Sequence, residues 1–398
     1  LSLPRELFLE RMSAVPIPDV ARHGALASPG ADPTAVAQAA EILVQAQSPL
    51  ILVGDSGRHP QSVAPLIELA ESLGAPVVSD NFRMNFPTVH PLYAGTLSSP
   101  YLEEADVILI IDQDIPYLPI RTRPRPDARL IQVDIDPVKA NIPLWFFPVD
   151  LVIQADSSRA IPALSQALQA VLTPERRAYF QSRGKEIEER HQAQRSNWHR
   201  LALDKAQQRP ISPEWLSHCL AEAVEEDDIV LSETVTNSAI VYRYLRRTRP
   251  GTLFQSGGSS LGWGLGAALG AKLAAPDRMV ITLVGDGDFV FCCPTAALWA
   301  ADVYHAPLLC VIFNNQLYRA PKRALRETYG GESCSERTGV WVGMDIAPPP
   351  DYALLARACR AYGETVTDPQ ELEAALRRAR DEVRGGRSAV LDVLISEV

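Results

Sequence analysis

Short apolar runs that end in glycine, aspartate or asparagine recur along this chain, and they constrain its fold more than any other feature. Segments with the apolar periodicity of an amphipathic helix lie between the runs, for example DPTAVAQAAEILVQA at 32–46. Strands buried on both faces of a parallel sheet have near-continuous apolar sequences and are connected by helices. The sequence therefore predicts an α/β protein with doubly wound parallel sheets. The runs that fit this description are PLILV (49–53), DVILII (106–111), RLIQVD (129–134), RMVITLV (278–284) and PLLCVIF (307–313).

The spacing of these patterns divides the chain into two domains. Its 398 residues are enough for two units that each have a core. Between them, the composition becomes charged and helical, which is typical of a solvated connecting segment. We expect an initial strand and linker over 1–30, a central Rossmann-like domain over 31–172, a helical linker over 173–209, and a second α/β domain over 210–398.

The composition argues against several classes of partner. With 46% hydrophobic residues and a net charge of -10, the chain lacks the basic face that binds nucleic acids or anionic membranes. The small-residue stretch at 257–275 contains Ser260 and Lys272 and is followed by Pro276, so we expect no membrane span there. The six cysteines show no metal-ligand spacing, which favours reduced thiols in a cytoplasmic protein.

Polar residues follow two consecutive apolar runs in the second domain. Gly285-Asp286-Gly287 ends one run, and Asn314-Asn315 ends the next. If the two strands are neighbours, these oxygen ligands meet at the carboxyl edge of the sheet, where ligands of open parallel sheets bind. Mg²⁺ prefers oxygen ligands and is often bound by protein oxygens together with phosphate oxygens. The glycines leave room for a phosphate to approach the backbone closely. Either motif alone is readily explained as an ordinary turn, but the pair on consecutive strands favours a binding site.

The second domain contains GDG, then 26 intervening residues, then NN. This pattern resembles the thiamine diphosphate and Mg²⁺ signature of the superfamily that includes acetolactate synthase, benzoylformate decarboxylase and pyruvate decarboxylase. The preceding SGGSSLGWGLGAALGAKLA (256–274) is similar to that family's glycine-rich segment. The arrangement of domains also agrees, because 31–172 resembles the central domain and 210–398 the diphosphate-binding domain. The resemblance implies thiamine diphosphate and Mg²⁺ as cofactors.

The resemblance implies roles for individual residues. Asp286 and Asn315 would coordinate Mg²⁺ through their side chains, and Leu317 through its carbonyl. Leu261 would pack beneath the cofactor, and Ser259 would offer its carbonyl to the aminopyrimidine ring. The remaining cofactor-binding candidates would contact the diphosphate, and they are Thr236, Asn237, Gly285, Gly287 and Asp288.

The segment after the asparagines resembles the part of the family that covers the cofactor and lines the substrate pocket. Tyr318 and Arg319 would lie near the reactive carbon, and Trp341 would add an apolar wall. Arg319, with Lys322 and Arg323, could receive a carboxylate or acyl-CoA phosphates. A solvated basic patch is the alternative.

In this family a glutamate on an amino-terminal pyrimidine-binding domain activates the cofactor, and 1–398 contains no segment that resembles that domain. Glu233 follows a strand on the phosphate side of the site and is a poor substitute. We therefore expect either a naturally split enzyme, with a pyrimidine-domain polypeptide as partner, or the remainder of a longer chain. Relatives form dimers or tetramers, so we also expect a homo- or hetero-oligomer.

The implied activity is making or breaking carbon–carbon bonds next to a carbonyl, with a small 2-keto acid as substrate. One alternative is a 2-hydroxyacyl-CoA lyase component, and another is a non-catalytic cofactor-binding or regulatory relative. Some relatives hold FAD or a CoA-type nucleotide in the central domain. Gly54-Asp55-Ser56-Gly57 lacks the GxGxxG pattern, so the sequence offers that nucleotide little support.

Overall fold

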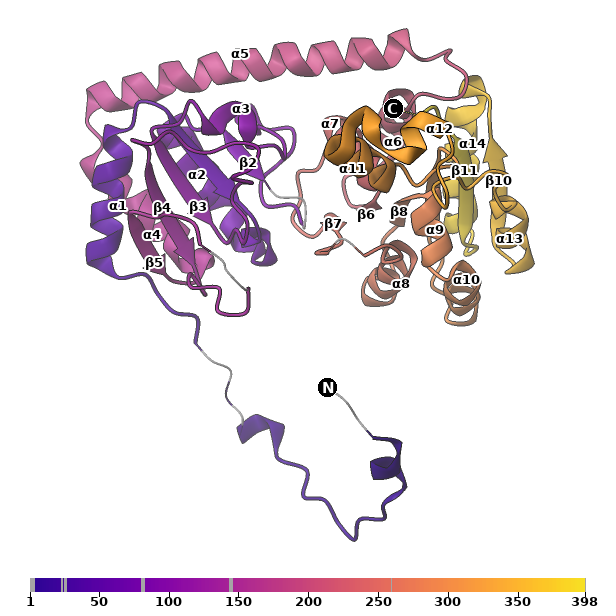
Figure 1. Cartoon of the computed structure of the whole chain (residues 1–398). Coiled ribbons are helices and arrows are strands. Elements are labelled where there is room, and N and C mark those ends of the chain that lie inside the picture. Colours follow the sequence, from indigo (N-terminus) through magenta and orange to yellow (C-terminus); the bar gives the residue numbers. More distant parts are fainter. Residues whose placement is uncertain are drawn as a thin grey trace.

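Two parallel β-sheets form the centres of two α/β domains, and one long helix runs alongside both of them (Figure 1). The computed structural model describes residues 4–22, 24, 27–79, 83–142, 146–258 and 260–397. The first sheet has five strands and the second has six, and the named strands pair in parallel throughout. The predicted α/β fold with two parallel sheets is thus confirmed.

The central domain has the strand order β2-β1-β3-β4-β5. Its strands are β1 (Pro49–Val53), β2 (Val77–Ser79), β3 (Val107–Ile111), β4 (Arg129–Asp134) and β5 (Leu151–Gln154). One face is covered by apolar residues of four helices, and the other by a short helix and loops. Asp32 caps the first helix by accepting from the Ala35 N–H (2.9 Å). The helices are α1 (Pro33–Gln45), α2 (Val63–Leu73), α3 (Ser99–Leu102) and α4 (Ser157–Val171).

Helix α5 (Pro174–Asp204) is the predicted charged linker, and its 31 residues contact both domains. Phe180 and Ile187 on α5 belong to the core of the central domain, whereas Ala202 packs in a cluster with residues of the second domain. Gly74 ends α2 at φ 52°, and a Cβ there would lie 2.1 Å from the Phe180 carbonyl oxygen. Glycine is therefore required where α2 and α5 meet.

The second domain has the strand order β10-β11-β9-β8-β6-β7. Its strands are β6 (Ile229–Glu233), β7 (Leu253–Gln255), β8 (Val280–Gly285), β9 (Leu309–Asn314), β10 (Tyr362–Val366) and β11 (Ala389–Leu394). Separate apolar clusters cover its two faces. The helices are α6 (Pro213–Ala223), α7 (Ser238–Tyr244), α8 (Gly264–Ala274), α9 (Asp286–Phe291), α10 (Pro294–Val303), α11 (Arg319–Tyr329), α12 (Cys334–Thr338), α13 (Tyr352–Ala358) and α14 (Leu372–Arg384).

The register of β8 and β9 decides where the two polar motifs lie. The strands are direct neighbours, and Gly285 is paired with Phe313. Because both strands run in the same direction, Asp286 and Asn314 leave the sheet at the same edge. The prediction that these two strand ends meet is confirmed.

The initial strand that we expected within 1–30 is not present among the described residues of that segment. Residues 4–22 are exposed and contain two 3₁₀ turns, Arg5–Leu9 and Val20–Arg22. Their backbone hydrogen bonds are local, such as Leu7 N–H to the Pro4 carbonyl (3.1 Å). A strand needs a neighbouring strand to pair its backbone groups, and no described residue pairs with this segment.

The described part of the chain has no helix with the length and apolar character needed to cross a bilayer. Its six cysteines are all free thiols.

Candidate functional site

A cavity of about 310 Å³ lies at the carboxyl edge of the second sheet, where β6, β8 and β9 end and α11 begins. Ligands of open parallel sheets bind at this edge. Most of the residues that we predicted for the site line this one cavity. They are Thr236, Asn237, Leu261, Gly285, Asp286, Gly287, Asp288, Asn315, Leu317, Tyr318 and Arg319.

Ser259, which we also predicted for the site, lies outside the described residues. The cavity has further lining residues that the sequence did not predict. Thr234 and Val235 directly follow β6, so the end of that strand was a usable signal for them. Phe313, Ala320 and Pro321 gave no comparable signal, because each is a common apolar residue in a strand or helix. The missed lining residues are Thr234, Val235, Phe313, Ala320 and Pro321.

Asp286 is the first residue of α9 and is 3% exposed. Burial raises the pKa of its carboxyl group to about 6, against the opposing effect of backbone N–H groups that include those of Gly287, Gln316 and Leu317. The amides of Gln316 and Leu317 belong to the loop after β9, so this side chain connects the two strand ends. Its Oδ2 is buried and has no hydrogen-bond partner among the described residues. A buried, unpartnered carboxylate oxygen fits a bound cation.

Asp288 is a second buried carboxylate, and it turns back on its own helix. Its Oδ2 accepts from the Gly285 N–H (3.0 Å). Burial raises the pKa of Asp288 to about 7, and the negative charges of Glu233 and Asp286 add to this shift. Asp286 and Asp288 therefore make the floor of the cavity acidic.

The two glycines of GDG are required by neighbouring side chains of the chain itself. A Cβ at Gly285 would lie 2.8 Å from Asp288 Oδ2, and a Cβ at Gly287 would lie 2.4 Å from the Tyr318 ring. We expected these glycines because a phosphate could then approach the backbone. The close contacts in this structure come from Asp288 and Tyr318.

The two consecutive asparagines have different surroundings. Asn314 is buried and is not among the residues that line the cavity; its Nδ2 donates to Asp392 Oδ1 (2.8 Å) and its Oδ1 accepts from the Gln316 N–H (3.1 Å). Asn315 lines the cavity, and its Oδ1 accepts from the Leu317 N–H (3.1 Å). Asn314 thus holds the loop in place, while Asn315 is the asparagine available to a ligand.

The Glu233 side chain binds the amino end of α8 and does not line the cavity. Its carboxylate accepts from the Trp263 N–H (3.0 Å) and the Gly264 N–H (2.7 Å), which begin α8. The Leu265 N–H is directed at Cys292 Sγ (3.5 Å). These side chains therefore already occupy the first amides of α8. A carboxylate stabilises the positive end of a helix dipole in this position.

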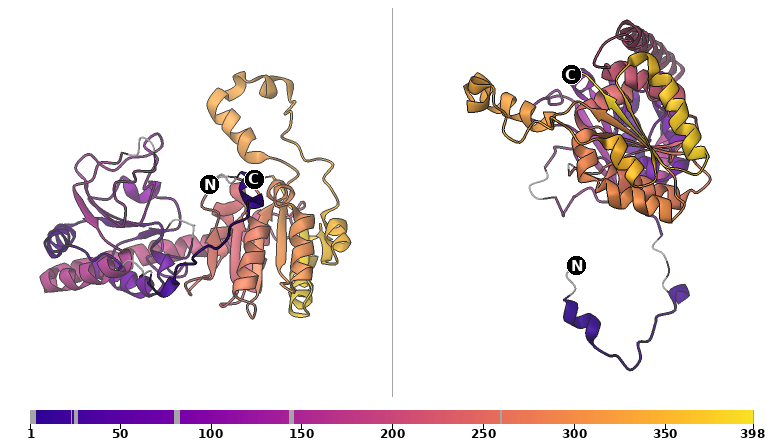
Figure 2. Two further views of the ribbon diagram at one scale, coloured as in Figure 1. Left: turned by 90° about the horizontal axis from the view of Figure 1, so that it is seen from below. Right: turned by 90° about the vertical axis from the view of Figure 1, so that its right-hand side faces the viewer.

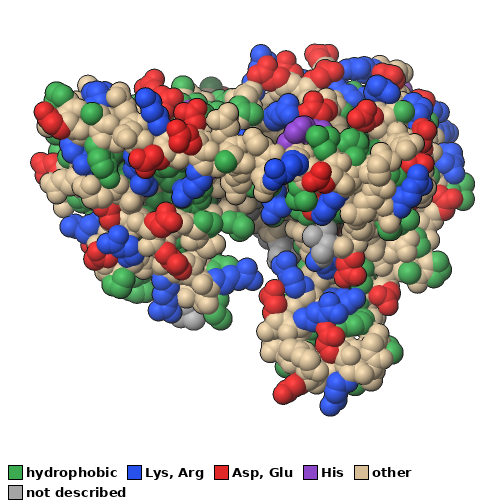
Figure 3. All heavy atoms as spheres, turned by 90° about the horizontal axis from the view of Figure 1, so that it is seen from above, with side chains coloured by type: hydrophobic (Ala, Val, Ile, Leu, Met, Phe, Trp, Pro, Cys, Tyr) green, Lys and Arg blue, Asp and Glu red, His purple; other side chains and the backbone are tan. Residues whose placement is uncertain are grey.

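Residues 318–344 form an arm that stands out from the second domain (Figure 2). The arm contains α11 and α12, and its base is closed by Tyr318 N–H to the Met344 carbonyl (2.7 Å). Figure 3 shows Lys and Arg side chains gathered along it. Trp341 does not line the cavity as we expected; it is buried within the arm, beneath Lys322 (5.2 Å from the ring centre) and Arg326 (5.1 Å). The arm lies away from the main core, so the Trp341 ring is buried against α11 of the arm itself.

The donor set at the cavity fits a hard cation shared with a phosphate. The described residues contain no group of three or more His, Cys, Asp or Glu side chains that could bind a metal without help. Mg²⁺ is commonly bound by one or two carboxylates together with substrate phosphates and water. That pattern is matched by one carboxylate oxygen of Asp286, the amide oxygen of Asn315 and the Leu317 carbonyl. Asn237 Oδ1 is also buried without a partner in the described chain, which leaves a polar atom for a ligand.

A larger hollow of about 920 Å³ lies at the opposite end of the same sheet, where charged side chains line it. Six of these side chains are already paired with one another. Arg380 lies 2.5 Å from Asp228, Arg384 lies 2.5 Å from Glu225, and Arg249 pairs with Asp227. We assign the ligand to the smaller cavity because its buried oxygens lack such partners.

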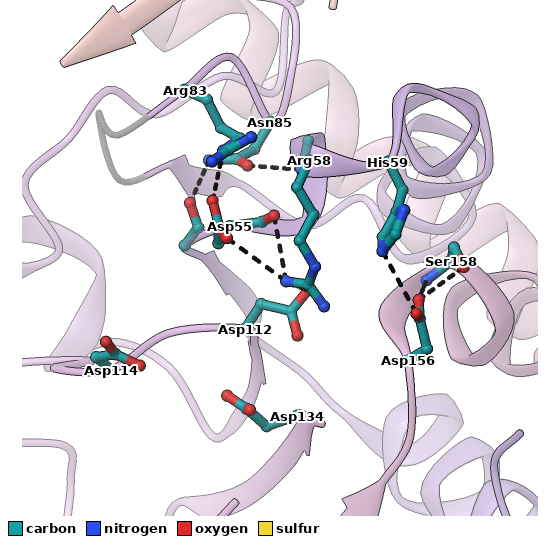
Figure 4. A network of polar contacts seen from close by, with 12 residues as sticks. Asp55, Arg58, His59, Arg83, Asn85, Asp112, Asp114, Asp134, Asp156 and Ser158 are labelled. Atoms are coloured by element: carbon teal, nitrogen blue, oxygen red, sulfur yellow. Dashed lines mark hydrogen bonds and ion pairs between the residues drawn. The ribbon is translucent and has the colours of Figure 1, made fainter. Parts of the chain in front are cut away.

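The carboxyl edge of the central sheet also carries acidic side chains (Figure 4). Arg58 lies 2.9 Å from Asp112, and Arg83 lies 2.5 Å from Asp55. Lys139 bridges two further aspartates at 2.7 Å each, Asp114 and Asp134. The edge where a nucleotide would bind therefore holds charges that are paired within the chain. The sequence offered little support for a FAD or CoA-type nucleotide in this domain, and these paired charges add none.

Comparison with known proteins identifies both domains. Residues 36–164 match the family model described as "Thiamine pyrophosphate enzyme, central domain", and residues 234–393 match "Thiamine pyrophosphate enzyme, C-terminal TPP binding domain". The chain belongs to the thiamine pyrophosphate enzyme family. The second match implies thiamine diphosphate (thiamine pyrophosphate) as the cofactor.

The similar proteins of this family catalyse different reactions. The chain is 26% identical to a sulfoacetaldehyde acetyltransferase of Rhodobacter capsulatus over 100% of this chain and 69% of that protein. It is 26% identical to a benzoylformate decarboxylase of Pseudomonas aeruginosa over 87% of this chain and 61% of that protein. The crystal structure of benzoylformate decarboxylase from Polynucleobacter necessarius superposes with a TM-score of 0.74 at 22% identity, covering 96% of this chain and 68% of that one. This likeness supports the fold.

Proposed function

We propose that the cavity at the ends of β6, β8 and β9 binds thiamine diphosphate with Mg²⁺, and that the chain is the large component of an enzyme that makes or breaks carbon–carbon bonds next to a carbonyl. The substrate is a small 2-keto acid. The observation that carries this proposal is the buried Oδ2 of Asp286, which has no hydrogen-bond partner in the described part of the chain and lies beside the loop after the neighbouring strand β9.

The residues of the cavity have separate tasks in this proposal. Asp286, Asn315 and the Leu317 carbonyl hold Mg²⁺, which neutralises the acidic floor. Thr236 and Asn237 hydrogen-bond the diphosphate, and apolar Leu261 packs against the organic part of the cofactor. Thiamine diphosphate, when bound, supplies the carbon nucleophile and the electron sink for the reaction.

The glutamate that activates the cofactor comes, in our proposal, from a pyrimidine-binding domain on the same or a separate polypeptide. Glu233 is committed to the amino end of α8, and no glutamate is among the described residues that line the cavity. An oligomer, in which neighbouring chains complete the site, suits this arrangement.

The first experiment is a calorimetric titration of the chain with thiamine diphosphate, with and without Mg²⁺. We expect binding that requires Mg²⁺, because the acidic cavity would otherwise repel the diphosphate. The two asparagines provide a matched pair. Asn315→Ala should weaken Mg²⁺-dependent binding without lowering the stability of the free chain. Asn314→Ala should lower that stability, because buried Asp392 loses a hydrogen-bond donor. Equal cofactor affinity with and without Mg²⁺ would contradict the metal assignment.

The second experiment measures turnover of a panel of 2-keto acids by the cofactor-loaded chain, alone and with a polypeptide that carries a pyrimidine-binding domain. We expect little turnover from the chain alone and a large increase with the added polypeptide. Rapid turnover by the chain alone would refute the requirement for a second domain. Cofactor binding without turnover in either mixture would instead favour a non-catalytic relative.

A further inference from the structure

Four basic side chains project from α11, and three of them have partners within the arm or beside it. Lys322 lies over the Trp341 ring and 4.0 Å from Glu397. Arg323 lies 3.4 Å from Glu327, one turn further along the helix, and Arg326 pairs with Glu336 and Trp341. The fourth is Arg319.

Arg319 differs from the other three in both position and pairing. It is the one Lys or Arg among the described residues that line the cavity. It is partly buried, and no described carboxylate lies within ion-pair distance of it. A partly desolvated cation with no counter-ion is costly, and an anionic ligand in the cavity would remove that cost.

We propose that Arg319 is a specificity-determining residue that binds an oxyanion on the substrate, a carboxylate or a sulfonate, which is not the carboxylate that leaves in the reaction. The inference rests on the proposed function, because the substrate is placed in the cofactor cavity. Arg319 is the first residue of α11, directly after Tyr318, whose ring contacts the Gly285–Gly287 turn. The guanidinium therefore lies at the wall of the cavity formed by the arm.

The chemistry of decarboxylation explains why the bound group is not the carboxylate that leaves. A carboxylate loses its charge as carbon dioxide departs, so an ion pair to that group would stabilise the substrate more than the transition state. A group that keeps its charge throughout the reaction is held equally well at every stage. Arginine also suits such groups because its planar donors match two oxygens of a carboxylate or sulfonate.

The test uses the chain saturated with thiamine diphosphate and Mg²⁺, titrated calorimetrically at constant ionic strength with succinate, propane-1-sulfonate and uncharged butanamide. We expect Arg319→Met to weaken the binding of at least one of the two anions roughly tenfold or more, and Arg319→Lys to retain part of the affinity. If Arg319→Met loses affinity for succinate alone, the substrate group that Arg319 binds is a carboxylate. If it loses affinity for propane-1-sulfonate alone, that group is a sulfonate. The matched control is Arg323→Met, which removes a cation from the same helix whose charge is already paired with Glu327.

Two results would overturn the inference. One is anion binding that is unchanged in Arg319→Met. The other is an equal loss of thiamine diphosphate affinity in that variant, which would make Arg319 part of the diphosphate site. If the unmodified chain does not bind thiamine diphosphate at all, the proposed function fails instead, and the two failures are thereby distinguished.

Discussion

The carboxyl edges of the two sheets are built from the same kind of α/β elements, but their acidic side chains meet different partners. At the central edge, Asp112 faces Arg58 and Asp134 faces Lys139. At the edge of the second sheet, Asp286 meets backbone amides, and a buried oxygen is left without a described partner. The acids of the central edge each have an arginine or lysine beside them, whereas Asp286 has no ion-pair partner among the described residues and would meet the cation of the function that we propose.

This difference shows why the fold alone does not locate the function. Both edges are positions where open parallel sheets bind ligands. The charge partners of the aspartates distinguish them, because a buried acid beside an arginine is a structural pair and a buried acid without one is a candidate ligand. The predictions below test the two halves of this contrast.

The largest effect is expected for Asp286→Ala. The variant removes the carboxylate that we assign to Mg²⁺, so Mg²⁺-dependent affinity for thiamine diphosphate should fall by at least about 100-fold. The free chain should be as stable as before or more stable, because burial disfavours the charge of this group. Calorimetry measures the affinity and urea unfolding the stability. Asp381→Ala, at an exposed position on α14, is the control. An unchanged cofactor affinity in Asp286→Ala would remove the basis of the site.

The reverse result is expected for Arg58→Met at the central edge. Asp112 is 3% exposed in its side chain and would be left without its cation, at a cost of roughly 2–3 kcal/mol in the free energy of unfolding. The double variant Arg58→Met/Asp112→Asn should recover most of the loss, because no buried charge remains unpaired. Arg125→Met, which breaks an exposed pair with Asp127, serves as control and should not shift the urea curve. If the single and double variants unfold together, the pairing at this edge is not what stabilises it.

The features that could be predicted from the sequence depend on local patterns. The apolar runs and the acidic or amide residues after them identify the strands and the edge, which is why Asp286 and Asn315 fall in one cavity. The charged segment that forms α5 was equally visible, because its many charged residues distinguish it from the apolar runs on either side.

The features that could not be predicted depend on contacts between distant residues. Glu233 caps α8 because the β6 end lies beside residues 263–264 in the folded sheet, about thirty positions later in the chain. Trp341 looked like a pocket wall, but the arm buries it against α11. That no described carboxylate forms an ion pair with Arg319, unlike its neighbours on α11, became visible only in the folded structure.

The smallest expected effect is a change in stability with pH, and this change has opposite signs in the two domains. His191 on α5 is buried, with Nε2 2.6 Å from the Tyr101 hydroxyl and Nδ1 2.6 Å from the Pro91 carbonyl oxygen. Burial lowers the pKa of His191 below its ordinary value, and Arg190 and Arg195 lower it further. The unfolded chain therefore binds a proton more readily than the folded chain. This contribution to stability is complete above about pH 6.5 and is lost as the pH falls below that value.

The edge of the second sheet should respond to pH with the opposite sign. Burial raises the pKa of Asp286 to about 6 and that of Asp288 to about 7, so their contribution is present at low pH and lost as the pH rises through that range. Hydrogen exchange of the metal-free chain at pH 5.5 and 7.0 should show weaker protection at lower pH where α5 meets the central domain, and stronger protection around α9. His191→Gln should abolish the first change and leave the second, whereas His305→Gln, at an exposed position, should alter neither. Retention of the first change in His191→Gln would mean that another group in the central domain takes up the proton.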